Sequence, residues 1–134
     1  MNGDYPGGRR RDLPERTFLF AQRVVGLCLS LEKRTGVSRT LCSQLLRSAT
    51  SIGANVEEGQ GSHSRADFAA KYGIACREAR ETKYWLRLLD GTGIVATDVI
   101  APLLDEAGQL VAILTTIVRK VKVNPVERGG KSKE

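Results

Sequence analysis

The chain has 134 residues, enough for one hydrophobic core and too few to divide comfortably into two domains. Hydrophobic residues make up 41% of it but aromatic residues only 5%, which argues against a sheet protein and favours an aliphatic core of packed helices. The formal net charge of +6 favours anionic partners, although it is spread along the chain and no segment is an overt basic arm.

The N-terminal segment and the cysteines bear on location and redox state. The N-terminus has no apolar segment of the signal-peptide type, and no later stretch reaches about 18 uncharged apolar residues. We therefore expect a cytoplasmic protein with no membrane partner. Cys28, Cys42 and Cys76 are odd in number and widely spaced, which argues against a disulfide framework or a zinc site and favours core packing.

Both ends of the chain are rich in glycine, proline and charge and are expected to be poorly ordered tails. The tails comprise residues 1–13 and 124–134, and the bundle comprises residues 14–123. The first helix is predicted from Pro14 to about Arg34, before Gly36. It carries two apolar stripes: Phe20, Val24, Leu27 and Leu31 form one, and Phe18, Val25 and Leu29 form the other. A helix that is apolar on two sides must be covered on two sides.

The second helix, predicted from its N-cap Ser38 to about Gly59, carries an apolar seam beside a polar row. The seam comprises Leu41, Leu45, Ala49, Ile52 and Val56, and the row comprises Gln44, Ser48, Ser51, Asn55 and Glu58. Both follow steps of three and four residues, so each occupies one helical face. Gly53 costs about 1 kcal/mol in a helix relative to alanine, which suggests the close approach of another backbone. The row predicts a polar contact that fixes register between helices, or side chains that bond back to their own helix.

The third helix is predicted from Arg65 to about Asp90, because Ser64 and Asp67 resemble a capping box. Its apolar seam alternates steps of four and three residues, which specifies nearly aligned helix packing. The seam comprises Phe68, Tyr72, Ala75, Ala79, Thr82, Leu86 and Leu89.

The fourth helix is predicted to start between Asp98 and Pro102 and to continue to about Val121. Its seam comprises Leu103, Ala107, Leu110, Leu114, Ile117 and Val121. A basic cluster at its C-terminal end complements the helix macrodipole, a structural explanation that competes with nucleic-acid binding. The cluster comprises Arg119, Lys120 and Lys122. Four antiparallel helices joined by short loops predict an all-α, up-down-up-down four-helix bundle.

One flank of the third helix is basic, and its members are Arg65, Arg80, Lys83 and Arg87. A solvated charged flank is the ordinary interpretation. The alternative is a track that neutralises successive phosphates of RNA or DNA without reading bases. The scarcity of aromatic residues argues against a sequence-specific reader of single strands.

The opposite flank of the third helix presents apolar and acidic residues, namely Ile74, Trp85 and Leu88 with Glu78 and Glu81. It is either the edge of a wide core or a subunit interface. We favour the interface, because the first helix also has a second apolar side and a ring of bundles would bury both.

Enzymatic interpretations find little support. A di-metal bundle needs two Glu-x-x-His motifs, and the chain has one histidine, His63, in a glycine-rich turn. Neither a phosphate-binding glycine loop nor a nucleophile elbow occurs. Glu57, Glu58, Glu78 and Glu81 could gather into a cation or acid–base site, but ion pairs with Arg47, Arg77 or Lys71 are simpler. We expect no enzymatic activity, no cofactor and no metal.

Three segments carry a family resemblance: RSATSIGANVEEG from Arg47, SHSRADF from Ser62 and IACREARETKYWLRLL from Ile74. Over about residues 17–121 the chain resembles the four-helix bundle proteins related to those encoded in intervening sequences of bacterial 23S ribosomal RNA genes. The resemblance implies a cytoplasmic homopentamer. The segment YWLRLLDG is also similar to the accessory variability determinant proteins of diversity-generating retroelements, which implies nucleic acid and a reverse transcriptase as partners.

The resemblance places family-signature positions on two helices of this chain. They are Arg47, Ser48, Ser51, Asn55, Glu58 and Gly59, with Glu78, Glu81, Trp85 and Leu86. It implies no enzymatic activity, and Glu57 stands where many relatives have alanine. The leading hypothesis is a non-enzymatic oligomeric bundle that binds RNA or DNA through backbone phosphates. The alternative is a protein–protein interaction scaffold without nucleic-acid binding.

Overall fold

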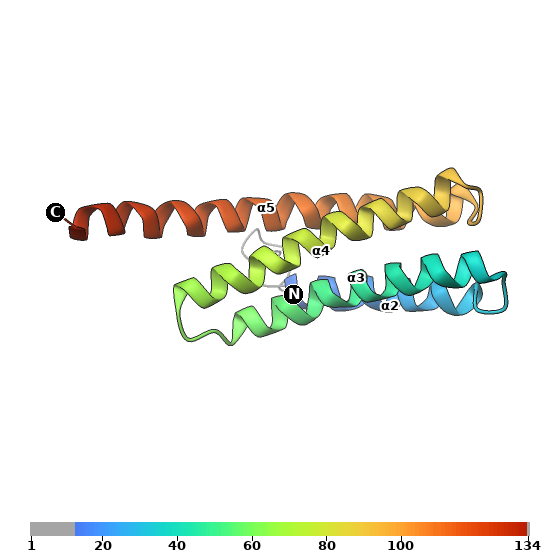
Figure 1. The fold of residues 1–134 in the computed structure, drawn as a ribbon, viewed down its shortest axis with the longest axis horizontal. Helices are drawn as coiled ribbons and strands as arrows, with labels where there is room; N and C mark the ends of the chain where they lie inside the picture. The colour runs from blue at the N-terminus through green and yellow to red at the C-terminus, as the bar shows by residue number, and fades with distance from the viewer. Residues whose placement is uncertain (1–12, 134) are drawn as a thin grey trace, which may run out of the picture.

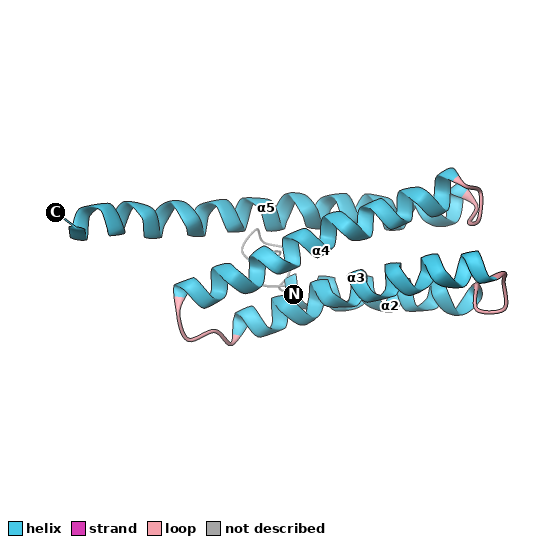
Figure 2. Cartoon of the chain, viewed as in Figure 1, coloured by secondary structure: helices cyan, strands magenta, loops and turns pink. Residues whose placement is uncertain are grey.

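The computed structural model describes the backbone of residues 13–133 and the side chains of residues 13–122. This part of the chain is all helical, with no strand. Its helices are α2 (Leu13–Ser30), α3 (Gly36–Gln60), α4 (Arg65–Gly91) and α5 (Thr97–Lys133). Consecutive helices run in opposite directions: the turns after α2 and α4 lie at one end, and the turn after α3 lies at the other (Figure 1). Short loops connect them (Figure 2), so the described residues form the predicted up-down-up-down bundle.

The N-terminal ends of α3 and α4 are fixed by side-chain caps. Ser64 caps α4 as predicted, because its Oγ accepts a hydrogen bond from the backbone N–H of Asp67 at 3.0 Å. The predicted cap of α3 was wrong by three residues. Thr35 takes that position and its hydroxyl accepts from the N–H of Ser38 at 3.5 Å, while Ser38 itself is buried inside the helix.

Two helix ends differ from the sequence-based expectation. α2 ends at Ser30 rather than near Arg34, because the chain turns there through hydrogen bonds between residues three apart, such as the Arg34 N–H to the Leu31 carbonyl at 3.0 Å. α5 extends past Val121 to Lys133, so the segment expected to be a C-terminal tail is described as helix. The expected N-terminal tail lies outside the described residues, except Leu13, which is buried at the start of α2.

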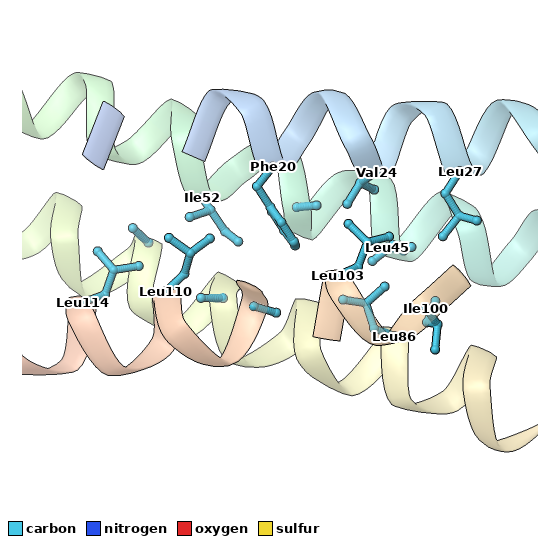
Figure 3. Packing of buried hydrophobic residues seen from close by; sticks show 14 of the residues in the cluster. Phe20, Val24, Leu27, Leu45, Ile52, Leu86, Ile100, Leu103, Leu110 and Leu114 are labelled. Atoms are coloured by element: carbon cyan, nitrogen blue, oxygen red, sulfur yellow. The ribbon is translucent and has the colours of Figure 1, made fainter. Parts of the chain in front are cut away.

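The core is built from the four predicted seams. Figure 3 shows side chains of all four helices pointing into one interior: Phe20, Val24, Leu27, Leu45, Ile52, Leu86, Ile100, Leu103, Leu110 and Leu114. These side chains are buried, and Phe20 and Tyr72 are the aromatic residues of the mainly aliphatic core in the described part of the chain. Ile117 and Val121 are only partly buried, because α5 runs past the start of α2 at that end (Figure 1).

Gly53 of α3 lies against Thr17 of α2. A Cβ atom at this position would lie 3.3 Å from Thr17 Oγ1 and 3.5 Å from the Thr17 carbonyl carbon. Thr17 is itself fully buried. The glycine thus allows the two backbones to come together, which explains why a residue with a poor helix propensity occurs there.

The seam between α2 and α5 is more open than the other seams. A cavity of about 450 Å³ lies between the two helices beside Arg16 and Glu106. A second cavity, of about 380 Å³, lies further along the same seam, beside Arg23 and Leu103. Among the described residues, Arg16 makes the side-chain hydrogen bonds that cross this seam, to Glu106 at 2.8 and 3.0 Å and to Gln109 at 3.1 Å.

One described segment, Thr97–Lys122 of α5, is long and apolar enough to cross a membrane by length and composition alone. Four of its seam residues, Leu103, Ala107, Leu110 and Leu114, are buried in the bundle. Packing in the bundle accounts for this buried face of the segment, while 28% of its most apolar window is buried in the structure.

Candidate nucleic-acid interface

Two buried hydroxyl groups join α3 to α4. Ser48 and Thr82 are fully buried, and the Thr82 hydroxyl donates to Ser48 Oγ at 2.8 Å. The Ser48 hydroxyl in turn donates to the carbonyl of Leu45 at 3.2 Å. Buried polar groups cost free energy unless they are paired, so this contact favours the one alignment of the helices that pairs them.

Ion pairs nearer the surface also join α3 to α4. Arg47 forms ion pairs with Glu78, at 3.4 Å, and with Glu81. Nearer the turn between α3 and α4, Lys71 pairs with Glu58 at 2.8 Å, and this hydrogen bond raises the pKa of Lys71. Residues later in α3 thus bind residues earlier in α4, as antiparallel helices require. A shift of one helical turn, about 5.4 Å, would separate all these pairs.

The rest of the polar row stays within its own helix. The Asn55 side-chain amide donates to the carbonyl of Ser51 at 2.9 Å, and Gln44 is exposed. Gly59 has a packing role instead, because a Cβ there would lie 2.5 Å from Tyr72 Cε1. The row is therefore divided between contacts that align two helices and bonds that satisfy one helix.

The buried hydroxyl pair makes a prediction for stability. Ser48→Ala and Thr82→Val are each expected to lower the free energy of unfolding by about 1 kcal/mol, the net value of a hydrogen bond. Because either change already breaks the shared bond, the double variant should lose less than the sum. Urea denaturation of the four proteins measures this coupling. Strict additivity would show that the two hydroxyl groups act independently.

An aromatic pair continues from the ion pairs on α4. The Trp85 indole N–H donates to Glu81 Oε2 at 3.0 Å, the carboxylate oxygen that also binds Arg47. Trp85 packs against the core, and the ring of Tyr84 meets it edge to face with a centroid distance of 5.1 Å. Tyr84 itself is 53% exposed. The predicted interface residues Ile74, Trp85 and Leu88 are all partly buried, and of the three Trp85 packs against the core.

The basic residues of α4 and α5 lie along one seam. Arg80 donates to Thr115 Oγ1 at 3.3 Å, which places this part of α4 beside the middle of α5. Arg119 and Lys122 lie four and seven residues after Thr115, on the same face of α5. Together with Lys83 and Arg87 on α4, they form what we call the basic seam, which comprises Arg80, Lys83, Arg87, Arg119 and Lys122.

Two of the predicted basic residues lie elsewhere. Lys120 is exposed but projects from a different face of α5 than Arg119 and Lys122. Arg65 is exposed at the first residue of α4, roughly 22 Å along the helix from Arg80. The structure therefore gathers five of the seven predicted basic residues.

The side chains of the basic seam are exposed, and none of them forms an ion pair with another described side chain. The ion pairs among the described side chains are Arg16–Glu106, Arg47–Glu78, Arg47–Glu81 and Lys71–Glu58. None of them involves a residue of the basic seam. The glutamates of α3 and α4 thus neutralise other cations and leave this surface positive.

The same ion pairs bear on the cation or acid–base site considered from the sequence. Glu58 binds Lys71, whereas Glu78 and Glu81 bind Arg47, so the four glutamates are not gathered into one cluster. Across the described residues, no group of three or more histidine, cysteine or acidic side chains is placed to hold a metal ion. His63 is exposed in the turn before α4.

Two cysteines that are distant in the sequence meet between α2 and α3. The Cys28 thiol donates to the Cys42 carbonyl at 3.6 Å. Burial, with a smaller contribution from Cys42, raises the pKa of the Cys28 thiol to about 12, and burial also raises that of Cys42. Such thiols are poor nucleophiles at neutral pH, and all three cysteines are free.

The raised pKa of Cys28 predicts a loss of stability in alkali. Above the ordinary pKa of 9.0 the unfolded chain releases the thiol proton while the folded chain keeps it until about pH 12. The contribution of Cys28 to the free energy of unfolding should therefore be constant below pH 9 and fall as the pH rises towards 12. Chemical denaturation at several pH values measures this, and Cys28→Ser should show a shallower decline. An identical decline in the variant would contradict the assignment.

Fold and surface together define the class of protein: an antiparallel four-helix bundle with polar contacts between α3 and α4 and a basic seam between α4 and α5. A family model described as 23S rRNA-intervening sequence protein matches residues 11–116. The chain belongs to this family, which confirms the resemblance found in the sequence.

A solved structure supports the same assignment. The chain is 35% identical to a protein of unknown function from the S23 ribosomal protein family of Bacteroides thetaiotaomicron VPI-5482, with a TM-score of 0.71. The match covers 78% of this chain and 96% of that one. Among curated proteins, none matches the chain.

Proposed function

We propose that the chain is a non-enzymatic, self-associating bundle that binds RNA or DNA through backbone phosphates. The observation that carries the proposal is the basic seam, whose five exposed cations take part in none of the ion pairs among the described side chains. Rigid helices hold these cations in a row, and such a row can neutralise successive phosphates without reading bases.

Self-association is supported by the outer face of α2. Phe18, Val25 and Leu29 are 56%, 38% and 62% exposed, and they form one apolar stripe along the helix. Burial of this stripe against another copy would remove it from water. A homopentamer, the assembly that the family resemblance implies, would carry a formal charge of five times +6, or +30. Repeated seams would then add by multivalency.

Binding at increasing salt concentration tests the proposal. The purified protein should bind RNA or DNA at low ionic strength, and the logarithm of the affinity should fall linearly with the logarithm of the salt concentration. Light scattering on the same sample counts the subunits. An absence of binding even at low salt would contradict the proposed nucleic-acid binding. A protein that stays monomeric at high concentration would contradict the proposed self-association.

A second candidate function is a protein–protein interaction scaffold. It is favoured by the composition around Arg47, because Trp, Tyr and Arg side chains dominate the binding energy of protein interfaces. Trp85→Ala should then weaken partner recruitment, while Arg80→Ala with Arg87→Ala should leave it unchanged. The nucleic-acid proposal predicts the larger effect for the arginine pair.

A further inference from the structure

The position of Tyr84 gives the basic seam a feature that phosphate binding does not use. Tyr84 lies four residues after Arg80 and three residues before Arg87, so all three share one face of α4. Tyr84 is 53% exposed. Lys83, the preceding residue, is exposed, and so is Arg77 two turns earlier on α4. An exposed aromatic ring thus lies on a stretch of α4 that also carries four exposed cations.

The Tyr84 ring is held in place by its contact with Trp85. Tyr84 packs edge to face on Trp85, with an interplanar angle of 74°. The Trp85 indole is in turn held by Glu81, and Glu81 by Arg47 from the neighbouring helix. This chain of contacts links the polar residues of α3 to an exposed ring, so an aromatic surface that would otherwise be mobile is preorganised.

Building on the proposed function, we propose that Tyr84 stacks against an unpaired base, so that the basic seam binds single-stranded nucleic acid in preference to a duplex. Every base has an aromatic face, so stacking adds affinity without demanding a sequence. The cations around the ring would hold the phosphates on either side of that base.

The charge around Tyr84 favours a nucleic acid over a protein as the occupant. The centre of a protein interface is depleted in charged residues, since their desolvation is costly. Here Arg77, Arg80, Lys83 and Arg87 lie within two turns of Tyr84 on α4, and none belongs to the ion pairs among the described side chains. The carboxylates on the same stretch, Glu78 and Glu81, are paired with Arg47. A row of cations with an aromatic ring is the combination found in proteins that bind single strands.

The test compares Tyr84→Leu, which removes the ring, with Tyr84→Phe, which keeps it. A mixed-sequence oligonucleotide is offered to the full chain either alone or annealed to its complement, at matched ionic strength. Tyr84→Leu should weaken single-strand binding by at least about fivefold and up to about 150-fold, the effect of one stacked base. Duplex binding and the salt dependence should not change, because no phosphate contact is lost. Tyr84→Phe should resemble the wild type.

Fluorescence supplies a second measurement. Trp85 is the only tryptophan and touches Tyr84, so its emission reports on this site alone. A single strand should change that emission in the wild type and in Tyr84→Phe, and far less in Tyr84→Leu. Circular dichroism confirms that each variant folds, which an exposed position should permit.

The remaining outcomes separate the two proposals. Equal single-strand binding by wild type and Tyr84→Leu would overturn the stacking inference and leave phosphate binding intact. A lower subunit count in Tyr84→Leu, with binding per subunit unchanged, would overturn it in favour of a protein interface. Failure of the wild type to bind either nucleic acid at low salt would overturn the proposed function and the inference with it.

Discussion

Replacing Gly59 with alanine is expected to lower the free energy of unfolding by about 1–3 kcal/mol, the cost of overpacking a core. The added Cβ would lie 2.5 Å from Tyr72 Cε1 and 2.6 Å from its Cδ1. The Tyr72 ring cannot move aside cheaply. It is buried, it stacks on Phe68 at a centroid distance of 4.1 Å, and its hydroxyl donates to Gln60 at 2.7 Å.

Gly73 provides the matched control for this experiment. It also lies within a helix, but nothing stands within 4 Å of the position of its Cβ. Gly73→Ala should therefore gain helix propensity and stabilise the protein by up to about 1 kcal/mol. Thermal and urea denaturation of both variants measures the contrast. Equal effects of the two substitutions would show that the contact between Gly59 and Tyr72 does not constrain the packing of α3 on α4.

Neutralising three cations of the basic seam is expected to have the largest effect on binding. Each phosphate contact with a single strand contributes about 0.7 to the slope of log affinity against log salt. Loss of three contacts in Arg80→Gln, Lys83→Gln, Arg87→Gln should lower the slope by about 2. The affinity at 0.1 M salt should then fall by about 100-fold per subunit.

The control for this variant removes the same charges from another surface. Arg23 on α2, Lys33 in the turn after it and Arg39 on α3 are exposed and do not belong to the basic seam. Their replacement by glutamine lowers the net charge equally, so it measures the nonspecific effect of charge alone. Filter binding over a range of salt concentrations compares the two triple variants. Similar losses in both would show that overall charge, rather than the basic seam, drives binding.

The fold was largely predictable because local patterns agree with the packing. The seams of the helices are spaced by three and four residues, and most of their members are buried, such as Val24, Leu45, Leu86 and Leu110. The cap at Ser64 has a local signature too. The cap at Thr35 was missed because two hydroxyl residues, Thr35 and Ser38, lie three apart and both fit the position.

The site was less predictable because it depends on how helices align. Neither the basic flank of α4 nor the basic cluster of α5 shows by itself that Arg80 lies beside Thr115, with Arg119 one turn further along. Likewise, the spacing of Cys28 and Cys42 does not show that they meet. The position of Tyr84 beside the basic flank could have been predicted, because its spacing from Arg80 and Arg87 places all three residues on one face of the helix.

The loose attachment of α2 to α5 has a consequence for the order in which the molecule opens. The two cavities along this seam remove contacts that would otherwise couple α2 to α5, and Arg16 supplies the described side-chain hydrogen bonds across it. Backbone amides of α2 should therefore exchange with deuterium before those of α3 and α4, whose mutual contacts are dense and polar. Docking of another copy on the outer stripe of α2 would slow that exchange, so protection of this helix would depend on protein concentration.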